Sequence, residues 1–566
     1  MLQEDNMAAI RKAETREART GGFITLLKIE DHDIYVYAPK DVMESDIINY
    51  GYSAPLLLVF PERKLNEEEA VDWAEESKLA CIASENGGSV VFANPLTTWS
   101  EEPAGLYETV VNKTKISQWG FSHGILYDDK VPKNRFMEAA MKRPGFDPVP
   151  EYFIFGSPVA CYVYGRGEGA DYLAKYYMKE ITGKAGMGDL GMADITLTAV
   201  TLENTKVVPE VEFENVSIVS VGNSDETNAA LLKSNNRVAV CDRFDAIEQY
   251  DRYIGDYKRW AGRIRESFNC RKEGVIMKPV RVTVNTSADN VGPGITRPTH
   301  EVGYVLFYNK NMEVHDPEHP VPLVLCFHGG GDTAIATAMI GDWPRIARDN
   351  NFMLCAVEMH LGVTATETVE IVEKLAEEFA IDRTRIYATG FSMGGIKSWD
   401  FYQEYPLFVA AVAPMDATVD VGENCQFTKA FRVNDSVLVP VFYNGGEQSP
   451  LAELPFQDQK CVNRMVNLFK VNKIRKHYDC RFDDQENWED RIYGIKGDYN
   501  IEGNDPEYPE SVTTIRCFES EDGNIYTELV SISNHQHNIR PNTCRLAWEF
   551  MKKFRRMPDG SISINE

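Results

Sequence analysis

The sequence has no long apolar run. Its 566 residues contain no stretch of about 18 consecutive apolar residues, so no transmembrane helix is predicted. The first 22 residues, MLQEDNMAAIRKAETREARTGG, lack the apolar centre of a secretory signal. We therefore expect a cytoplasmic protein.

Paired cysteines and metal-binding motifs are also missing. The 11 cysteines are an odd number, and none of them form a C-x-x-C pair. Several lie in apolar runs, such as Cys326 and Cys355, which predicts reduced and buried thiols rather than disulfides. No histidine, cysteine or carboxylate spacing matches a metal-ligand pattern, so we expect neither a metal nor a cofactor.

Basic charge is scarce. The chain has 59 Lys and Arg against 86 Asp and Glu, a formal net charge of -27. A chain this acidic is repelled by the phosphates of nucleic acids and by anionic membrane surfaces. We therefore expect no nucleic-acid or membrane partner, and the sequence leaves a homodimer open.

The length and the pattern of apolar residues predict two α/β domains. The hydrophobic fraction of 43% suits a globular protein, and 566 residues exceed one typical core. Short apolar runs, such as 322–329, 352–359 and 385–391, alternate with stretches of helical periodicity, such as 364–382. This alternation is typical of a mainly parallel sheet with crossover helices.

The two halves of the sequence resemble each other. SAPLLLVFPE at 53–62 resembles VPLVLCFHGG at 321–330, and residues 162–177 resemble residues 387–405, in the same order. We therefore predict two tandem, related α/β domains, each a mainly parallel sheet flanked by helices. The predicted domains are residues 1–272 and residues 273–566.

One short segment has the pattern of a nucleophile turn. Gly390-Phe391-Ser392-Met393-Gly394 matches G-x-S-x-G, directly after a predicted strand and before a predicted helix. In this context the serine lies at the tip of a strained turn with its Oγ exposed, and the flanking glycines avoid side-chain clashes. Ser392 is therefore the candidate nucleophile. The Met393 N–H, at the helix N-terminus, is a candidate oxyanion donor.

A glycine run supplies the other half of an oxyanion hole. His328-Gly329-Gly330-Gly331 follows an apolar strand. Consecutive glycines let backbone N–H groups approach a substrate oxygen closely. We favour Gly330 as the donor, and we expect the three other residues of the run to contact substrate or shape its pocket.

The general base is expected after the last strand, if the chain order is serine, acid, histidine. LVSISNHQHNIRP at 529–541 offers His535 and His537. His535 comes first after the apolar stretch, so it is the predicted base. His537 is the predicted neighbour that holds the loop or touches substrate.

The acid is expected at the end of the strand VPVFYNGG. Glu447 is the first carboxylate there, and in that place it would orient the imidazole and stabilise its protonated form. Glu453, Asp458 and Asp416 remain alternatives.

Together these motifs resemble the α/β-hydrolase superfamily. Residues of about 300 to 560 are similar to the polyhydroxybutyrate-depolymerase-like esterases, a group related to feruloyl and acetylxylan esterases. The segments that carry this similarity are HGGG, GFSMGG, NGGE, and NHQHNIRP before AWEFMKKF. The resemblance implies that Ser392 is the nucleophile, His535 the base, and 328–331 the oxyanion loop. One departure is that Gln448 stands at the position where that group usually has its acid.

This resemblance implies a serine carboxylic-ester hydrolase that acts through an acyl-enzyme. The expected substrate is a small-molecule or oligomeric ester with a short-chain, hydroxyacyl, aryl or sugar group. An acyltransferase or a serine peptidase with the same triad is one alternative, and a non-catalytic hydrolase-like binding protein is another.

The first half lacks the same chemistry. Its turn is Gly165-Arg166-Gly167-Glu168-Gly169, with a glycine where the nucleophile should stand, and Phe60-Pro61-Glu62-Arg63 replaces HGGG. We therefore predict a degenerate, non-catalytic first domain. In the second half, an aromatic-rich insertion at about 476–524 that includes Trp488 is expected to form a lid or wall of the substrate site.

Overall fold

The chain forms two compact units, Met1–Asn269 and Cys270–Glu566, and each is described by itself. The computed structural model describes residues 10–29, 31–43, 55–107, 109–110, 157–178, 197–211, 216–234, 237–255, 268–288, 298–329, 333–358, 363–419, 430, 432–449 and 458–565. Among these residues, no helix has the length and apolar character needed to cross a membrane.

The first unit has a nine-stranded sheet in the order β1-β2-β3-β5-β4-β6-β7-β8-β9. The first three strands are antiparallel, and β5 onward are parallel to one another. Its strands are β1 (Ile10–Glu17), β2 (Phe23–Ile29), β3 (His32–Ala38), β4 (Pro55–Phe60), β5 (Ser89–Ala93), β6 (Ser157–Arg166), β7 (Leu197–Glu203), β8 (Ser217–Val221) and β9 (Arg237–Cys241). Its helices are α2 (Lys40–Met43), α3 (Glu67–Glu76), α4 (Leu79–Asn86), α7 (Glu168–Tyr176), α8 (Asp225–Leu232) and α9 (Ala246–Gly255).

The second unit has a ten-stranded sheet in the order β10-β11-β13-β12-β14-β15-β16-β19-β18-β17. Its strands are β10 (Val275–Asn285), β11 (Thr299–Asn309), β12 (Val321–Phe327), β13 (Met353–Val357), β14 (Ile381–Phe391), β15 (Ala411–Met415), β16 (Val441–Gly446), β17 (Tyr499–Asn504), β18 (Val512–Glu519) and β19 (Ile525–Ile532). Its helices are α10 (Ala334–Ile340), α11 (Trp343–Asn350), α12 (Ala365–Glu378), α13 (Met393–Glu404), α14 (Gln459–Val471) and α15 (Pro541–Met551). Short 3-10 turns, η4 (Lys310–Glu313) and η5 (Phe482–Asn487), and a hairpin of β20 (Phe554–Arg556) with β21 (Ile562–Ile564) complete it.

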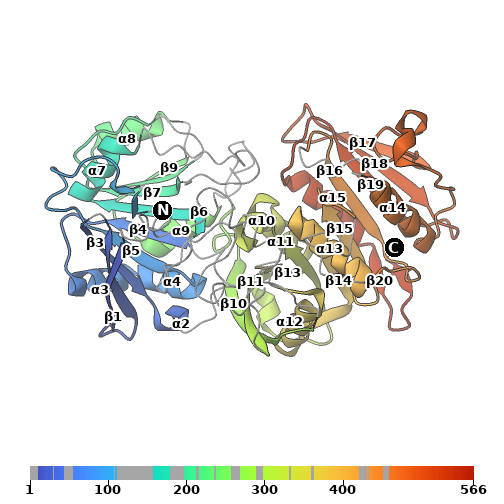
Figure 1. The fold of residues 1–566 in the computed structure, drawn as a ribbon, viewed down its shortest axis with the longest axis horizontal. Coiled ribbons are helices and arrows are strands. Elements are labelled where there is room, and N and C mark those ends of the chain that lie inside the picture. Colours follow the sequence, from blue (N-terminus) through green and yellow to red (C-terminus); the bar gives the residue numbers. More distant parts are fainter. Residues whose placement is uncertain are drawn as a thin grey trace, which may run out of the picture. The chain divides into compact units, whose positions relative to one another are not determined.

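Helices pack against both faces of the second sheet (Figure 1). Tyr443 of β16 joins the cluster that includes Trp399 of α13, while the adjacent Phe442 contacts Phe550 of α15. Because both faces are covered, the central strands are continuous apolar runs, and β13 and β15 are buried throughout. The predicted α/β class is therefore confirmed.

The α12 helix shows how the sequence sets an element boundary. Thr364 and Glu367 form a capping box at its start, where each side chain accepts the backbone N–H of the other. The predicted helix of 364–382 is too long at its end, because the chain is already paired with β12 at Ile381. The helix itself ends at Glu378.

The two sheets share one strand order. From β2 to β9 the first sheet repeats the order and the strand directions of β10 to β19 in the second. The similar segments 53–62 and 321–330 lie on β4 and β12, which occupy equivalent positions. The second sheet then adds β18 and β17, which are antiparallel and come from the insertion.

Candidate active site

Ser392 is the single residue between β14 and α13. Its φ of 54° and ψ of -119° are strained values for a residue with a side chain. Its N–H donates to Met415 O on the neighbouring strand at 2.9 Å. A Cβ at Gly394 would overlap the Phe327 carbonyl, and one at Gly390 would overlap the Gly394 carbonyl, so both flanking glycines are required by close backbone approach. The structural context that G-x-S-x-G requires is therefore present.

The predicted oxyanion loop starts at the end of β12. Gly329 faces the nucleophile turn, since a Cβ at Gly329 would lie 3.0 Å from Phe391 Cδ1. Gly330 and Gly331, the other predicted members, lie outside the described residues. Met393, the second predicted donor, begins α13, so its N–H is at the N-terminus of that helix. Of the glycine run, Gly329 thus lies beside Phe391, the residue before Ser392.

His328 supports this loop from inside the protein. Its side chain is fully buried, with 0% exposure, which suits a residue that shapes the pocket from inside rather than one that touches substrate. Its Nδ1–H donates to Gly329 O at 2.7 Å, and burial lowers its pKa to about 4, which keeps the ring neutral at pH 7.

A buried carboxylate from another connection, which no sequence motif predicted, also contacts this loop. Glu358, directly after β13, accepts from Ala334 N–H at 3.1 Å through Oε1. Its Oε2 lies 3.6 Å from His328 Nε2. One buried carboxylate thus lies close to both His328 and Ala334. Its position could have indicated this role, because Glu358 follows an apolar strand at the same sheet edge as the nucleophile turn.

His535, the predicted base, contacts its own loop. Its Nε2–H donates to Asn538 O at 2.9 Å. Its ring packs beside Gly446, where a Cβ would lie 2.8 Å from His535 Cδ2. Burial, and to a smaller extent the Arg540 guanidinium, lowers its pKa to about 3. In this arrangement the hydrogen bond from Nε2 stabilises the loop that follows β19.

His537 contacts the nucleophile turn instead. Its ring centroid lies 4.5 Å from that of Phe391, the residue before Ser392. Its Nδ1 lies 3.1 Å from Ser449 Oγ, after the end of β16. Burial lowers its pKa to about 4, so the ring is neutral at pH 7. Of the two histidines, His537 thus contacts the nucleophile turn, while His535 contacts its own loop.

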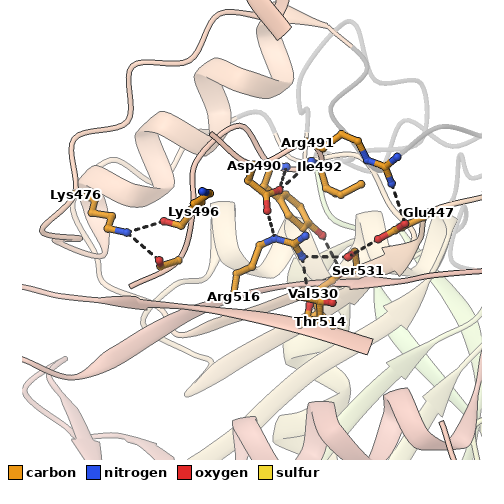
Figure 2. A network of polar contacts seen from close by, with 12 residues as sticks. Glu447, Lys476, Asp490, Arg491, Ile492, Lys496, Thr514, Arg516, Val530 and Ser531 are labelled. Atoms are coloured by element: carbon orange, nitrogen blue, oxygen red, sulfur yellow. Dashed lines mark hydrogen bonds and ion pairs between the residues drawn. The ribbon is translucent and has the colours of Figure 1, made fainter. Parts of the chain in front are cut away.

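Glu447, the predicted acid, faces another network (Figure 2). Its Oε1 accepts from Ser531 Oγ at 2.8 Å, and its Oε2 accepts from Arg491 at 3.3 Å. Ser531 also accepts from Arg516, whose Nε donates to Asp490 Oδ2 at 2.6 Å. Among the described residues, the hydrogen bonds of the Glu447 carboxylate thus go to Ser531 and Arg491, and not to a histidine.

The alternative acids divide into three cases. Asp416 follows β15, and its buried carboxyl accepts from Gly446 N–H at 2.8 Å. Burial raises its pKa to about 8, although that N–H and Arg540 act in the opposite direction. Asp458 instead caps α14 by accepting from two backbone N–H groups. Glu453 lies outside the described residues.

The insertion is not an aromatic loop. Part of it forms the strands β17 (Tyr499–Asn504) and β18 (Val512–Glu519), and the Tyr493 hydroxyl donates to Val530 O at 2.9 Å. Trp488, a predicted substrate residue, packs beside Gly494 and donates from Nε1 to Arg481 O at 3.0 Å. Tyr478 and Tyr493 belong to the core of the second unit. These aromatic residues therefore stabilise the domain instead of forming the predicted lid.

The first unit contains the corresponding turn without a hydroxyl. Gly167, between β6 and α7, has φ 55° and ψ -123°, and its N–H donates to Glu203 O at 2.9 Å. A Cβ at Gly167 would lie 2.9 Å from Glu62 Cβ. The Arg166 Nε lies 3.7 Å from Glu62 and 3.8 Å from Glu203. Charged side chains thus surround this turn.

Comparisons with known proteins give weak likenesses. No protein-family model and no curated protein sequence matches the chain. Acetyl xylan esterase from Aspergillus awamori aligns at a TM-score of 0.32 and 10% identity, over 48% of this chain and 99% of that one. S-formylglutathione hydrolase from Staphylococcus aureus aligns at 0.23 and 13%, over 32% and 81%. A thermostable esterase aligns at 0.25 and 21%, over 34% of this chain and 52% of its own length.

Proposed function

We propose that the second unit is a serine carboxylic-ester hydrolase of the α/β-hydrolase type. Ser392 is the nucleophile, and His537 is the general base. The observation that supports this most is the strained conformation of Ser392 between β14 and α13, with His537 packed on the adjacent Phe391. The strand order of the second sheet also fits, because the nucleophile follows β14 near the centre of the sheet.

The reaction proceeds through an acyl-enzyme. His537 Nε2 takes the proton of the Ser392 hydroxyl as its oxygen attacks the ester carbonyl carbon. The Met393 N–H and a backbone N–H of the glycine loop stabilise the oxyanion. The alcohol leaves with the proton from His537. Water, activated by the same histidine, then hydrolyses the acyl-enzyme and restores the serine.

The proposed substrate is a neutral ester, with a short-chain, hydroxyacyl, aryl or sugar group. The net charge of -27 opposes anionic substrates by long-range repulsion. The resemblance of the HGGG, GFSMGG and NHQHNIRP motifs to polyhydroxybutyrate-depolymerase-like esterases supports the same class. Under this proposal the first unit, with Gly167 in place of a nucleophile, has no hydrolase activity of its own.

Hydrolysis of p-nitrophenyl acetate and butyrate tests the proposal. Ser392→Ala should lower kcat by at least about 10³-fold, because the acyl-enzyme of the proposed mechanism forms on Ser392. Ser100→Ala, at an exposed serine of the first unit, is the control and should match wild type. Absence of turnover in the folded wild type would contradict the proposal, as would an active Ser392→Ala.

A further inference from the structure

We propose that the Ser449 hydroxyl orients His537, in the place along the chain where a carboxylate is expected. This inference rests on the proposed function. Ser449 lies three residues after the last residue of β16, Gly446, in the connection that should supply the acid of the triad.

Contacts hold Ser449 and His537 in this relation. Ser449 Oγ lies 3.1 Å from His537 Nδ1, and their exposures are 8% and 7%. The Ser449 N–H donates to Gly446 O at 3.2 Å, which closes a turn.

The connection after β16 is also joined to the histidine loop through the backbone. The Gln448 N–H donates to His535 O at 2.9 Å, and the Glu447 N–H donates to Ile532 O at 3.0 Å. These backbone hydrogen bonds hold the segments that bear Ser449 and His537 in place relative to each other. The backbone therefore positions the Ser449 hydroxyl beside the His537 ring.

The required tautomer defines the role of the hydroxyl. A general base needs its lone pair on Nε2, so His537 must have its proton on Nδ1. The Ser449 oxygen can accept that Nδ1–H in both the neutral and the protonated state of the ring. Unlike a carboxylate, it has no charge with which to stabilise the imidazolium. Ser449 is therefore a positioning residue.

The described carboxylates nearby are bound elsewhere. Glu447 accepts from Ser531 and Arg491, and Asp416 accepts from Gly446 N–H. The charged and titratable groups around this loop also include His535 and Arg540, and Arg540 pairs with Asp505 at 3.6 Å. Among the described residues, the Ser449 hydroxyl is thus a side chain in contact with His537 Nδ1.

Steady-state kinetics of Ser449→Ala and Ser449→Thr test this role. Ser449→Ala should lower kcat about 10- to 100-fold, the value of one hydrogen bond to the charged ring of the transition state, with KM within about twofold. Ser449→Thr retains the hydroxyl and should recover most of the lost kcat. A general loss of packing would instead change KM and would not be rescued selectively by threonine.

The same kinetic measurements distinguish a wrong role for Ser449 from a wrong proposed function. Wild type that turns over esters while Ser449→Ala keeps its full kcat would overturn the inference alone. A loss with Glu453→Gln as large as with His537→Ala, together with a mild effect of Ser449→Ala, would also overturn it in favour of Glu453. A folded wild type without turnover would overturn the proposed function itself.

Discussion

Gly167 and Ser392 have the same backbone conformation at equivalent turns of two different sheets. Their φ and ψ angles are 55° and -123° for Gly167, and 54° and -119° for Ser392. Each N–H donates at 2.9 Å to the carbonyl of the last residue of the next strand, Glu203 or Met415. The turn therefore forms with or without a nucleophile, and the first unit has its geometry without its hydroxyl.

Gly167→Ser should not create a nucleophile. The new Cβ would lie 2.9 Å from Glu62 Cβ, and the nearby Glu62 carboxylate would repel an oxyanion. We expect the free energy of unfolding to fall by about 1–3 kcal/mol from strain and crowding. In a Gly167→Ser, Ser392→Ala double variant, mass spectrometry should find no fluorophosphonate on residue 167. A labelled Ser at that position would contradict this account.

His537→Ala should lose far more activity than His535→Gln. Removal of the base lowers kcat by at least about 10³-fold. A glutamine at 535 can still donate to Asn538 O, so its kcat should stay within about tenfold of wild type. Ester hydrolysis by the purified variants measures both. The reverse order would restore His535 as the base, and a large loss with Glu447→Gln would restore Glu447 as the acid.

Asp416→Asn should stabilise the protein increasingly as pH rises. The folded state raises the pKa of Asp416 from 3.8 to about 8, so between these values it holds a proton that the unfolded chain has lost. The wild type therefore loses stability with rising pH, by up to about 1.4 kcal/mol per pH unit, and asparagine removes this dependence. Urea denaturation from pH 5 to 8 measures it. Parallel pH curves for the two proteins would contradict the burial of a neutral carboxyl.

Arg516→Met and Arg491→Met should differ strongly. Arg516 forms a buried ion pair with Asp490, and its loss leaves that carboxylate without its cation, at a cost of about 3–5 kcal/mol. Arg491 is 84% exposed at the other end of the same network (Figure 2), so its loss should cost less than about 1 kcal/mol. Equal urea midpoints for both variants would show that the network does not anchor the insertion.

The sequence predicted elements with strong local patterns. The predicted strand 385–391 ends at Phe391, as β14 does, and Ser392 lies at the predicted strand-to-helix turn. Both depend on local features. One is an apolar run, and the other is a pair of glycines that are needed because backbone atoms approach each other closely. The insertion was harder, because β17 is exposed along its whole length and its short alternation, Tyr499 and Ile501 between polar residues, buries no face.

The partners of Ser392 depend on side-chain directions, which sequence order does not give. Glu447 and Ser449 lie in the same connection, yet Glu447 faces Ser531 while Ser449 faces His537. His535 and His537 are likewise separated by one residue and contact different groups. Only the packed loops determine which side chain meets the nucleophile turn.

Fluorophosphonate labelling of the wild type, followed by mass spectrometry, tests the central claim most directly. The reagent reacts with an activated serine and needs no knowledge of the natural substrate. The account predicts one label, on Ser392, that Ser392→Ala abolishes and His537→Ala slows strongly. A folded wild type that is not labelled, or a label on another serine such as Ser449, would contradict it.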